Sequence, residues 1–317
     1  MAVFPIRLLP PDTKIDFIGR RMIAFVFSAL LMVLSIGFFA VQGLNYGIDF
    51  KGGILMEVRT PGPADIDSLR NKLSGLGLGE VALQEFGQAT DVLIRIERQA
   101  GGEKGQMLAV EKVKTALGKD VASYRRTEFV GPKVGGELIQ AGVIAVTLSL
   151  IAIMIYVWFR FEWQFSIGAV VALTHDVIAT IGIFSVLGLE FNLATVAAIL
   201  TIAGYSINDT VVVFDRIREN LRKFKAMPTE DLLNLSVNQT LSRTLLTSIT
   251  TLLALVAIFF FGGAVIKDFS FALIWGVLVG TYSSIFVAAP VVMMLNIRGI
   301  TTGSIGGEDV EEKTPAE

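Results

Sequence analysis

The 317-residue sequence contains no cysteine, a single histidine and no excess of basic charge. The absence of cysteine excludes disulfides and cysteine-bound metals. A net charge of −2 gives no indication of nucleic-acid binding. No nucleophile–base pair, metal-ligand cluster or phosphate-binding loop occurs in a context that supports it. The sequence therefore predicts neither an enzyme nor a bound metal or cofactor.

Hydrophobic residues make up 53% of the chain, and they are concentrated in long runs. Runs of about 18 or more apolar residues are typical of helices that cross a bilayer. The first run is too long for the apolar core of a signal peptide, so we interpret it as an uncleaved anchor. We predict an α-helical membrane protein with six spans, at 22–43, 134–159, 163–189, 191–214, 241–266 and 269–297.

Lysine and arginine are distributed unevenly among the connections between spans. They precede span one and follow spans two, four and six, at Arg7, Lys14, Arg20, Arg21, Arg160, Arg216, Arg218, Arg222, Lys223, Lys225 and Arg298. The opposite short connections carry only Lys267. Because basic loops stay in the cytoplasm, we predict cytoplasmic termini (1–21 and 298–317) and a large loop, 44–133, on the far side.

Two further segments have distinct patterns. Residues 215–240 place Ile217, Leu221 and Phe224 at helical spacing opposite a basic face, which predicts an amphipathic helix on the inner membrane surface. The tail 298–317 is rich in glycine and then acidic, which is typical of disorder.

The large loop has the pattern of a small folded domain. Strand-like and helical runs alternate in the order βαββαβ, at 54–60, 63–77, 81–86, 91–97, 103–118 and 120–130. This order predicts a ferredoxin-like α+β domain between spans one and two. We interpret it as a docking module, because no catalytic pattern accompanies it.

Asp209 lies inside span four, with 18 uncharged residues before it. An ionisable residue at this depth is costly to insert, and it therefore indicates function. Helical spacing places Thr201, Tyr205 and Asn208 on the same face, so we expect a polar stripe that faces other helices. The structural alternative is a carboxylate fixed by hydrogen bonds.

Two other charged positions accompany Asp209. Arg243 opens span five, and Thr247 continues its face into the membrane, so its guanidinium could reach Asp209. The alternative is an arginine that extends to the headgroups. Asp176 lies at the centre of span three beside His175. We expect either a proton-relay role or a helix-packing role for these two residues.

Four motifs together resemble the SecF family of bacterial protein-export membrane proteins. They are GIDFKGG (47–53), HDV (175–177), GYSINDTVVVFDRIREN (204–220) and SRTLLTSITT (242–251), and the resemblance runs from about residue 15 to 298. The motif positions in the outer loop are Gly47, Asp49, Phe50, Gly52 and Gly53.

The resemblance implies half of a resistance-nodulation-division (RND) exporter fold in the bacterial inner membrane. It implies partnership with SecD, with the SecYEG channel, with a translocating unfolded polypeptide and with membrane lipid. It also implies that proton motive force drives late steps of export. The functional acid and arginine of the family correspond to Asp209 and Arg243, which we expect to form a link that protonation loosens.

Two alternatives remain open at this point. One is a small-molecule or lipid exporter of the RND superfamily, in which the chain would have to pair with itself. The other is an assembly scaffold that conducts no ions, in which the polar groups within the membrane only pack helices.

Overall fold

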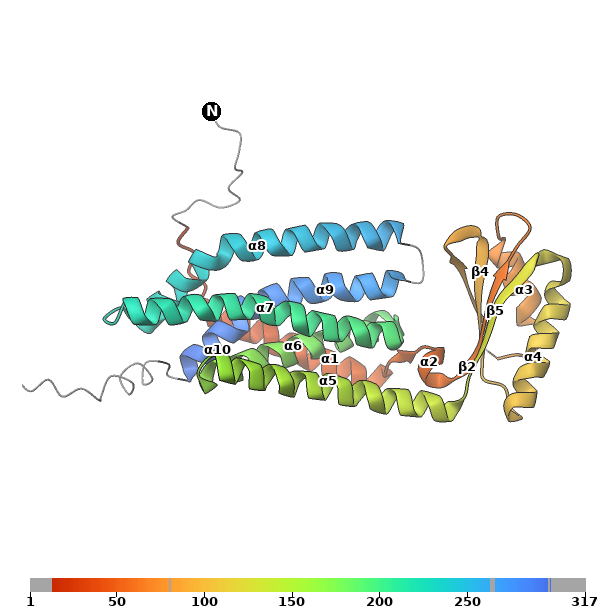
Figure 1. Ribbon diagram of the computed structural model, residues 1–317, viewed down its shortest axis with the longest axis horizontal. Helices are drawn as coiled ribbons and strands as arrows, with labels where there is room; N and C mark the ends of the chain where they lie inside the picture. Colours follow the sequence, from red (N-terminus) through yellow and green to blue (C-terminus); the bar gives the residue numbers. More distant parts are fainter. Residues whose placement is uncertain (1–12, 80, 263–265, 296, 298–317) are drawn as a thin grey trace, which may run out of the picture.

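The computed structural model describes residues 13–79, 81–262, 266–295 and 297. The helices form an elongated bundle, and a small sheet domain lies at one end of it (Figure 1). The residues predicted as the start of the cytoplasmic N-terminus (1–12) and as the disordered tail (298–317) lie outside the described part.

Six helical segments in the described residues are long and apolar enough to cross a membrane, which agrees with the predicted number of spans. They are α1 (Arg21–Gln42), α5 (Pro132–Arg160), α6 (Trp163–Leu187), α7 (Leu193–Lys223), α8 (Thr229–Phe261), and the sixth segment formed by α9 (Lys267–Ser283), η3 (Ser284–Ala288) and α10 (Ala289–Met294). Large side chains such as Phe159 and Phe261 are almost fully exposed on their outer faces. Such an apolar exterior is suited to lipid.

The sixth span changes its helical pitch between α9 and α10. Residues Ser284–Ala288 form a π-helical turn between α9 and α10. Pro290 is the second residue of α10 and has no backbone N–H, so it cannot form the usual hydrogen bond to the preceding turn. Single π turns inside helices are frequent at functional sites.

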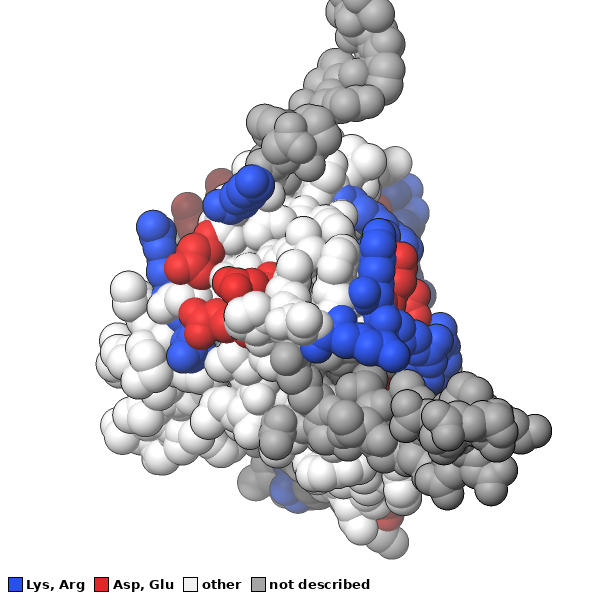
Figure 2. Space-filling view, turned by 90° about the vertical axis from the view of Figure 1, so that its left-hand side faces the viewer, with Lys and Arg blue, Asp and Glu red and all other residues white. Residues whose placement is uncertain are grey.

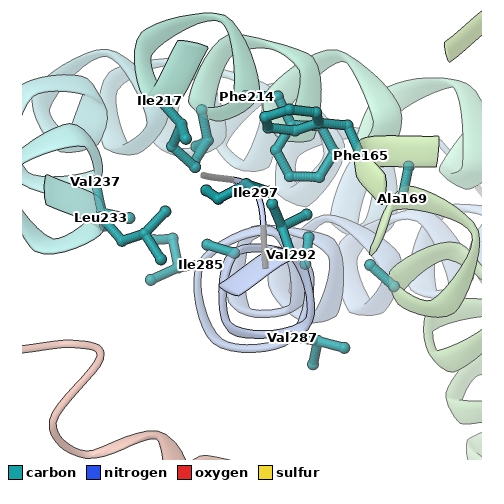
Figure 3. Close-up of a cluster of buried hydrophobic side chains, with 14 of the residues drawn as sticks. Phe165, Ala169, Phe214, Ile217, Leu233, Val237, Ile285, Val287, Val292 and Ile297 are labelled. Atoms are coloured by element: carbon teal, nitrogen blue, oxygen red, sulfur yellow. The ribbon is translucent and has the colours of Figure 1, made fainter. Parts of the chain in front are cut away.

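A hydrophobic core joins the helices at the end of the bundle opposite the sheet domain. Phe165 of α6 packs edge-on against Phe214 of α7, with ring centroids 5.0 Å apart. Figure 3 shows these rings beside Val292 of the sixth span, and Leu233 and Val237 of α8 on the other side of the same cluster.

The structure differs from the predicted connection at 215–240. Helix α7 continues to Lys223 and α8 begins at Thr229, so only five residues, 224–228, separate them. Ile217 and Leu221, which we expected on the membrane surface, are buried in the core against α8 residues such as Leu232. An apolar stripe on a helix packs against a neighbouring helix when one is available, and α8 supplies it here.

Charged side chains of both signs gather at this same end of the bundle (Figure 2). Ion pairs join the ends of different helices at Arg21–Glu230, Arg160–Asp215 and Arg218–Glu162, and Arg216–Glu219 forms within α7.

The sheet domain has the predicted ferredoxin-like topology. The strands β2 (Gly53–Arg59), β3 (Val81–Phe86), β4 (Gln88–Glu97) and β5 (Ser123–Val130) form an antiparallel sheet in the order β3-β4-β2-β5. Gly87 makes the β3–β4 turn with a φ of +73°, a conformation that glycine adopts without strain. Helices α3 (Ile66–Ser74) and α4 (Gly102–Leu117) cover one face of the sheet (Figure 1).

Candidate functional site

Asp176 lies at the centre of the helix bundle and is completely buried. Its Oδ2 accepts hydrogen bonds from Ser206 of α7, at 2.6 Å, and from Ser283 of α9, at 2.8 Å. His175 Nδ1 lies 3.1 Å from Oδ1. Both carboxylate oxygens therefore have partners, and the side chain joins α6 to two other helices.

His175, the only histidine, is buried beside this carboxylate. When Nδ1 carries the ring hydrogen it donates to Asp176, and Nε2, which has no hydrogen-bond partner in the described part of the chain, is left as an acceptor. The imidazole lies near the ring of Tyr282, whose hydroxyl donates to the carbonyl of Ala24 on α1 at 2.9 Å. A ring contact and a hydrogen bond thus connect the Asp176 cluster to α1.

Asp209 has a more open environment than Asp176. It is half-buried, and its Oδ1 accepts a hydrogen bond from Thr244 Oγ1 of α8 at 2.6 Å. Its Oδ2 is buried and has no hydrogen-bond partner among the described residues. The carboxylate is therefore held at one oxygen and free at the other.

The expected pairing of Asp209 with Arg243 is not formed in this structure. Arg243 is exposed, and no ion pair joins it to a carboxylate in the described part of the chain. The residue that contacts Asp209 is its neighbour Thr244, because the helical turn directs Thr244 toward α7 and Arg243 away from it. Arg243 is close enough to attract the carboxylate electrostatically.

The predicted polar stripe on α7 is only partly buried. Thr201 and Asn208 are exposed on the bundle surface. Tyr205 is half-buried, and its hydroxyl lies 3.5 Å from Ser248 Oγ on α8. Thr247 bonds the carbonyl of Arg243 in its own helix. The stripe therefore lies along the edge of the α7–α8 contact rather than inside this chain.

The GIDFKGG motif forms the junction between bundle and sheet domain. Residues Asn45–Tyr46 (β1) pair in parallel with Glu190–Phe191 (β6), the connection between α6 and α7. After β1 comes the short helix α2 (Ile48–Lys51).

Within this motif, Asp49 accepts the backbone N–H of Leu193 at 3.0 Å, at the start of α7. Phe50 stacks on Phe191, with centroids 6.0 Å apart.

Glycines of the motif have conformational and steric roles. Gly52 and Gly53 have φ values of +75° and +148°, which disfavour any other residue. A Cβ on Gly47 would lie 2.6 Å from Glu190 Oε1. The motif is therefore built for a close approach of the loop to the β6 segment.

An ion pair closes the same junction. Arg95 of β4 donates to Glu190 in the α6–α7 connection, and both side chains are about one-fifth exposed. Burial raises the pKa of Glu190, and the neighbouring carboxylates of Asp268 and Asp49 add to this effect, whereas Arg95 opposes it. The pair binds the sheet domain directly to the connection that begins α7.

Several residues of these sites are not predictable from the sequence. Ser206, Ser283 and Thr244 are hydroxyl residues within spans. Their sequence positions do not indicate a function, because their role depends on a carboxylate from another helix. Glu190 could have been noticed, because it is the single charged residue between two predicted spans. No group of three or more metal-ligating side chains was found among the described residues.

Comparison with known proteins gives two family matches. Residues 109–298 match the family described as "Protein export membrane protein SecD/SecF, C-terminal". Residues 37–60, which include GIDFKGG, match the "SecD/SecF GG Motif".

Relatives match over almost the whole chain. The chain is 46% identical over 297 residues to "Protein translocase subunit SecF" of Rickettsia rickettsii, covering 93% of this chain and 96% of the relative. It is 45% identical over 301 residues to the protein of the same description from Rickettsia prowazekii, covering 94% of this chain and 96% of the relative.

Solved structures agree with these matches. The fold is similar to the crystal structure of SecDF, a translocon-associated membrane protein from Thermus thermophilus, with a TM-score of 0.77 and 38% identity. The similarity covers 92% of this chain but only 40% of that longer chain. A second structure, SecDF in a super-membrane-facing form, gives a TM-score of 0.71 at 38% identity, covering 95% and 41%. The chain therefore belongs to the SecD/SecF family of protein-export membrane proteins, on its SecF side.

Proposed function

We propose that this chain is an auxiliary subunit of a bacterial protein-export complex in the inner membrane, where it uses proton motive force to promote late steps of export. Family membership supports the export role. The intramembrane carboxylate of Asp209 supports the use of protons.

The half-open environment of Asp209 carries the proposal. Oδ1 is held by Thr244, and Oδ2 is buried without a hydrogen-bond partner among the residues that the structure describes. A proton can be added at Oδ2 while Oδ1 keeps its hydrogen bond, because a protonated carboxyl still accepts at its other oxygen. Asp176 differs, since protonation there would compete with the hydroxyl donors at Oδ2 or the imidazole at Oδ1. We therefore assign the main relay role to Asp209, and a secondary or positioning role to Asp176 and His175.

Arg243 would act on the ionised state of Asp209. It lies one residue before Thr244 on α8, and its charge attracts the carboxylate. Proton release would strengthen this attraction and draw the guanidinium toward Asp209, and protonation would release it. One charge moved across 100 mV is worth about 2.3 kcal/mol, so a few protons could shift α7 relative to α8.

The junction offers a route from this shift to the sheet domain. Helix α7 carries Asp209, and its first turn is bound to Asp49. The segment just before α7 holds Arg95 of the sheet domain through Glu190. A tilt of α7 would therefore move the sheet domain, which we propose acts on an unfolded polypeptide as it leaves the SecYEG channel.

The exposed polar face of α7 and α8 supports the proposal that another membrane protein binds there. Thr201, Asn208 and Arg243 are exposed in this chain. Polar side chains within a span are normally covered by protein or line a water-filled cavity. We propose that a SecD-type chain covers this face. The basic residues at the opposite end from the sheet domain favour a cytoplasmic position for that end and for both termini.

The test is proton-dependent export in inverted membrane vesicles in which the only SecF-type chain is a variant. Asp209→Asn should abolish the stimulation of export by proton motive force, and Asp209→Glu should retain part of it. Arg243→Gln should resemble Asp209→Asn, and Arg243→Lys should retain part of the stimulation.

The matched control is Asp215→Asn, on the same helix but outside the buried site, where the carboxylate pairs with Arg160 and is exposed. It should leave stimulation unchanged. Full stimulation in Asp209→Asn would refute the relay. Loss of the complex itself, measured by co-purification of the partner chain, would favour the scaffold alternative.

A further inference from the structure

A cavity of about 260 Å³ lies inside the bundle next to the sheet domain. Its walls come from α1, α5, α6 and α7, and its end is formed by Tyr46, Phe50 and Phe191 of the junction. Almost all of the lining is aliphatic or aromatic, as at Val146, Ile181 and Ile199. It is separate from the Asp176 and Asp209 sites, whose residues do not line it.

Water is a poor occupant for this cavity. A buried water needs two to four polar partners. The hydroxyl of Thr147 is already donated to the carbonyl of Val143 at 2.8 Å. The walls otherwise consist almost entirely of hydrocarbon and aromatic side chains. A protein interior is normally packed without voids of this size, so an apolar molecule is the chemically matched occupant.

The cavity opens sideways into the membrane region. Helix α1 packs on α6, whereas α5 packs on α6 and α7, and the exposed part of the cavity lining comes from α1 and α5. Phe39 on α1 and Ile139 and Val143 on α5 line the cavity and are also exposed at 43%, 36% and 62%. In a bilayer these exposed side chains contact lipid tails.

We propose that this cavity binds one acyl chain of a membrane phospholipid, which enters between α1 and α5. An apolar cavity of about 150 Å³ is large enough for benzene, so this larger one can hold a segment of a lipid tail. The tail would support Phe50 and Phe191, and would therefore stabilise the junction with the sheet domain. The proposal does not depend on the proton relay.

The experiment measures how many phospholipid molecules each purified full chain retains after extensive washing in detergent. The retained lipid is extracted and quantified by mass spectrometry. Gly142→Leu should fill the cavity, because a Cβ at this position meets only Val196, at an ordinary 3.6 Å. The four carbons of leucine would displace a similar number of methylene groups from the lipid tail. Retention should fall at least about tenfold from about one phospholipid per chain, because each methylene changes affinity several-fold.

The matched control is Gly37→Leu, which adds the same side chain to α1 at an exposed position with nothing within 4 Å. It should retain lipid like the wild type. Val146→Phe is a second variant that fills the cavity, and it is used if Gly142→Leu does not fold. The folding of both variants is checked by their melting temperature.

The outcomes are distinct. Selective loss of lipid in the two filling variants supports the site. Equal retention in wild type, filling variants and control overturns it, because the lipid would then be bound elsewhere. A wild-type chain that retains no lipid alone, but whose α1–α5 opening crosslinks to a co-purified membrane chain, overturns it in favour of a partner side chain.

Discussion

Replacement of Asp176 tests whether its hydrogen bonds hold the bundle together. Asp176→Asn preserves the shape of the side chain. The amide nitrogen has two hydrogens, and both Ser206 and Ser283 can accept them, because a hydroxyl both donates and accepts. The amide oxygen can still accept from His175 Nδ1. This variant should therefore fold with nearly wild-type stability.

Asp176→Ala removes every acceptor from the same place. Ser283 has a second acceptor, the carbonyl of Gly280 at 3.2 Å, but His175 Nδ1 and Ser206 Oγ lose the carboxylate bonds described above. A buried donor without a partner costs about 1–3 kcal/mol. Two such donors give a loss of about 2–6 kcal/mol, which corresponds to a melting temperature lower by roughly 4–24 °C.

The assay is thermal unfolding of purified protein in one detergent, followed by the intrinsic fluorescence of its three tryptophans. The prediction is an order of stability, with wild type and Asp176→Asn close together and Asp176→Ala well below. An alanine variant as stable as the asparagine variant would refute the reasoning, since the cluster would then contribute nothing. Proton-dependent export by Asp176→Asn shows, in addition, whether Asp176 takes part in the relay.

Three further predictions concern other parts of the molecule. Glu190→Arg should release the sheet domain from the bundle, seen as faster hydrogen exchange in β1 and β6, and the double variant with Arg95→Glu should restore protection. If the double variant does not restore protection, the ion pair does not hold the junction. In the sheet domain, the Arg59 hydrogen bond holds the pKa of Asp91 below its usual value of 3.8. The contribution of Asp91 to stability is therefore complete above that pH and is lost as pH falls through the lowered pKa. Hydrogen exchange in β2 and β4 should accelerate in acid, and an Asp91→Asn variant with the same acid dependence would contradict this. Gly182→Leu should separate α1 from α6 and lower the melting temperature, because a Cβ there would lie 2.7 Å from a backbone atom of α1. Unchanged melting would show that α1 adjusts freely.

The number of membrane-spanning helices and the order of elements in the sheet domain could be read from the sequence for a physical reason. A bilayer span needs a long apolar run, and a half-buried strand needs alternation, and both patterns are local. The strand-like runs 81–86 and 91–97 predicted a hairpin, because Gly87 lies between them and favours a turn. The position of Asp209 in a span, likewise, was visible from the residues around it.

A local pattern does not show whether the apolar stripe of a helix lies on the membrane surface or packs against another helix. Ile217 and Leu221 have the spacing of a surface-bound helix, and only the fold shows that α8 covers them. Arg243 was expected to reach Asp209, but the direction of its side chain depends on how α8 is rotated against α7.

The sequence by itself determined which segments enter the membrane and which carboxylates they carry, because insertion depends on composition along the chain. Only the tertiary structure decided what each carboxylate contacts. Asp176 is enclosed by hydroxyls from α7 and α9, and Asp209 keeps one oxygen that no described residue contacts through a hydrogen bond. These partners lie 30 and 107 residues from Asp176, so their convergence is a property of helix packing that no local pattern encodes.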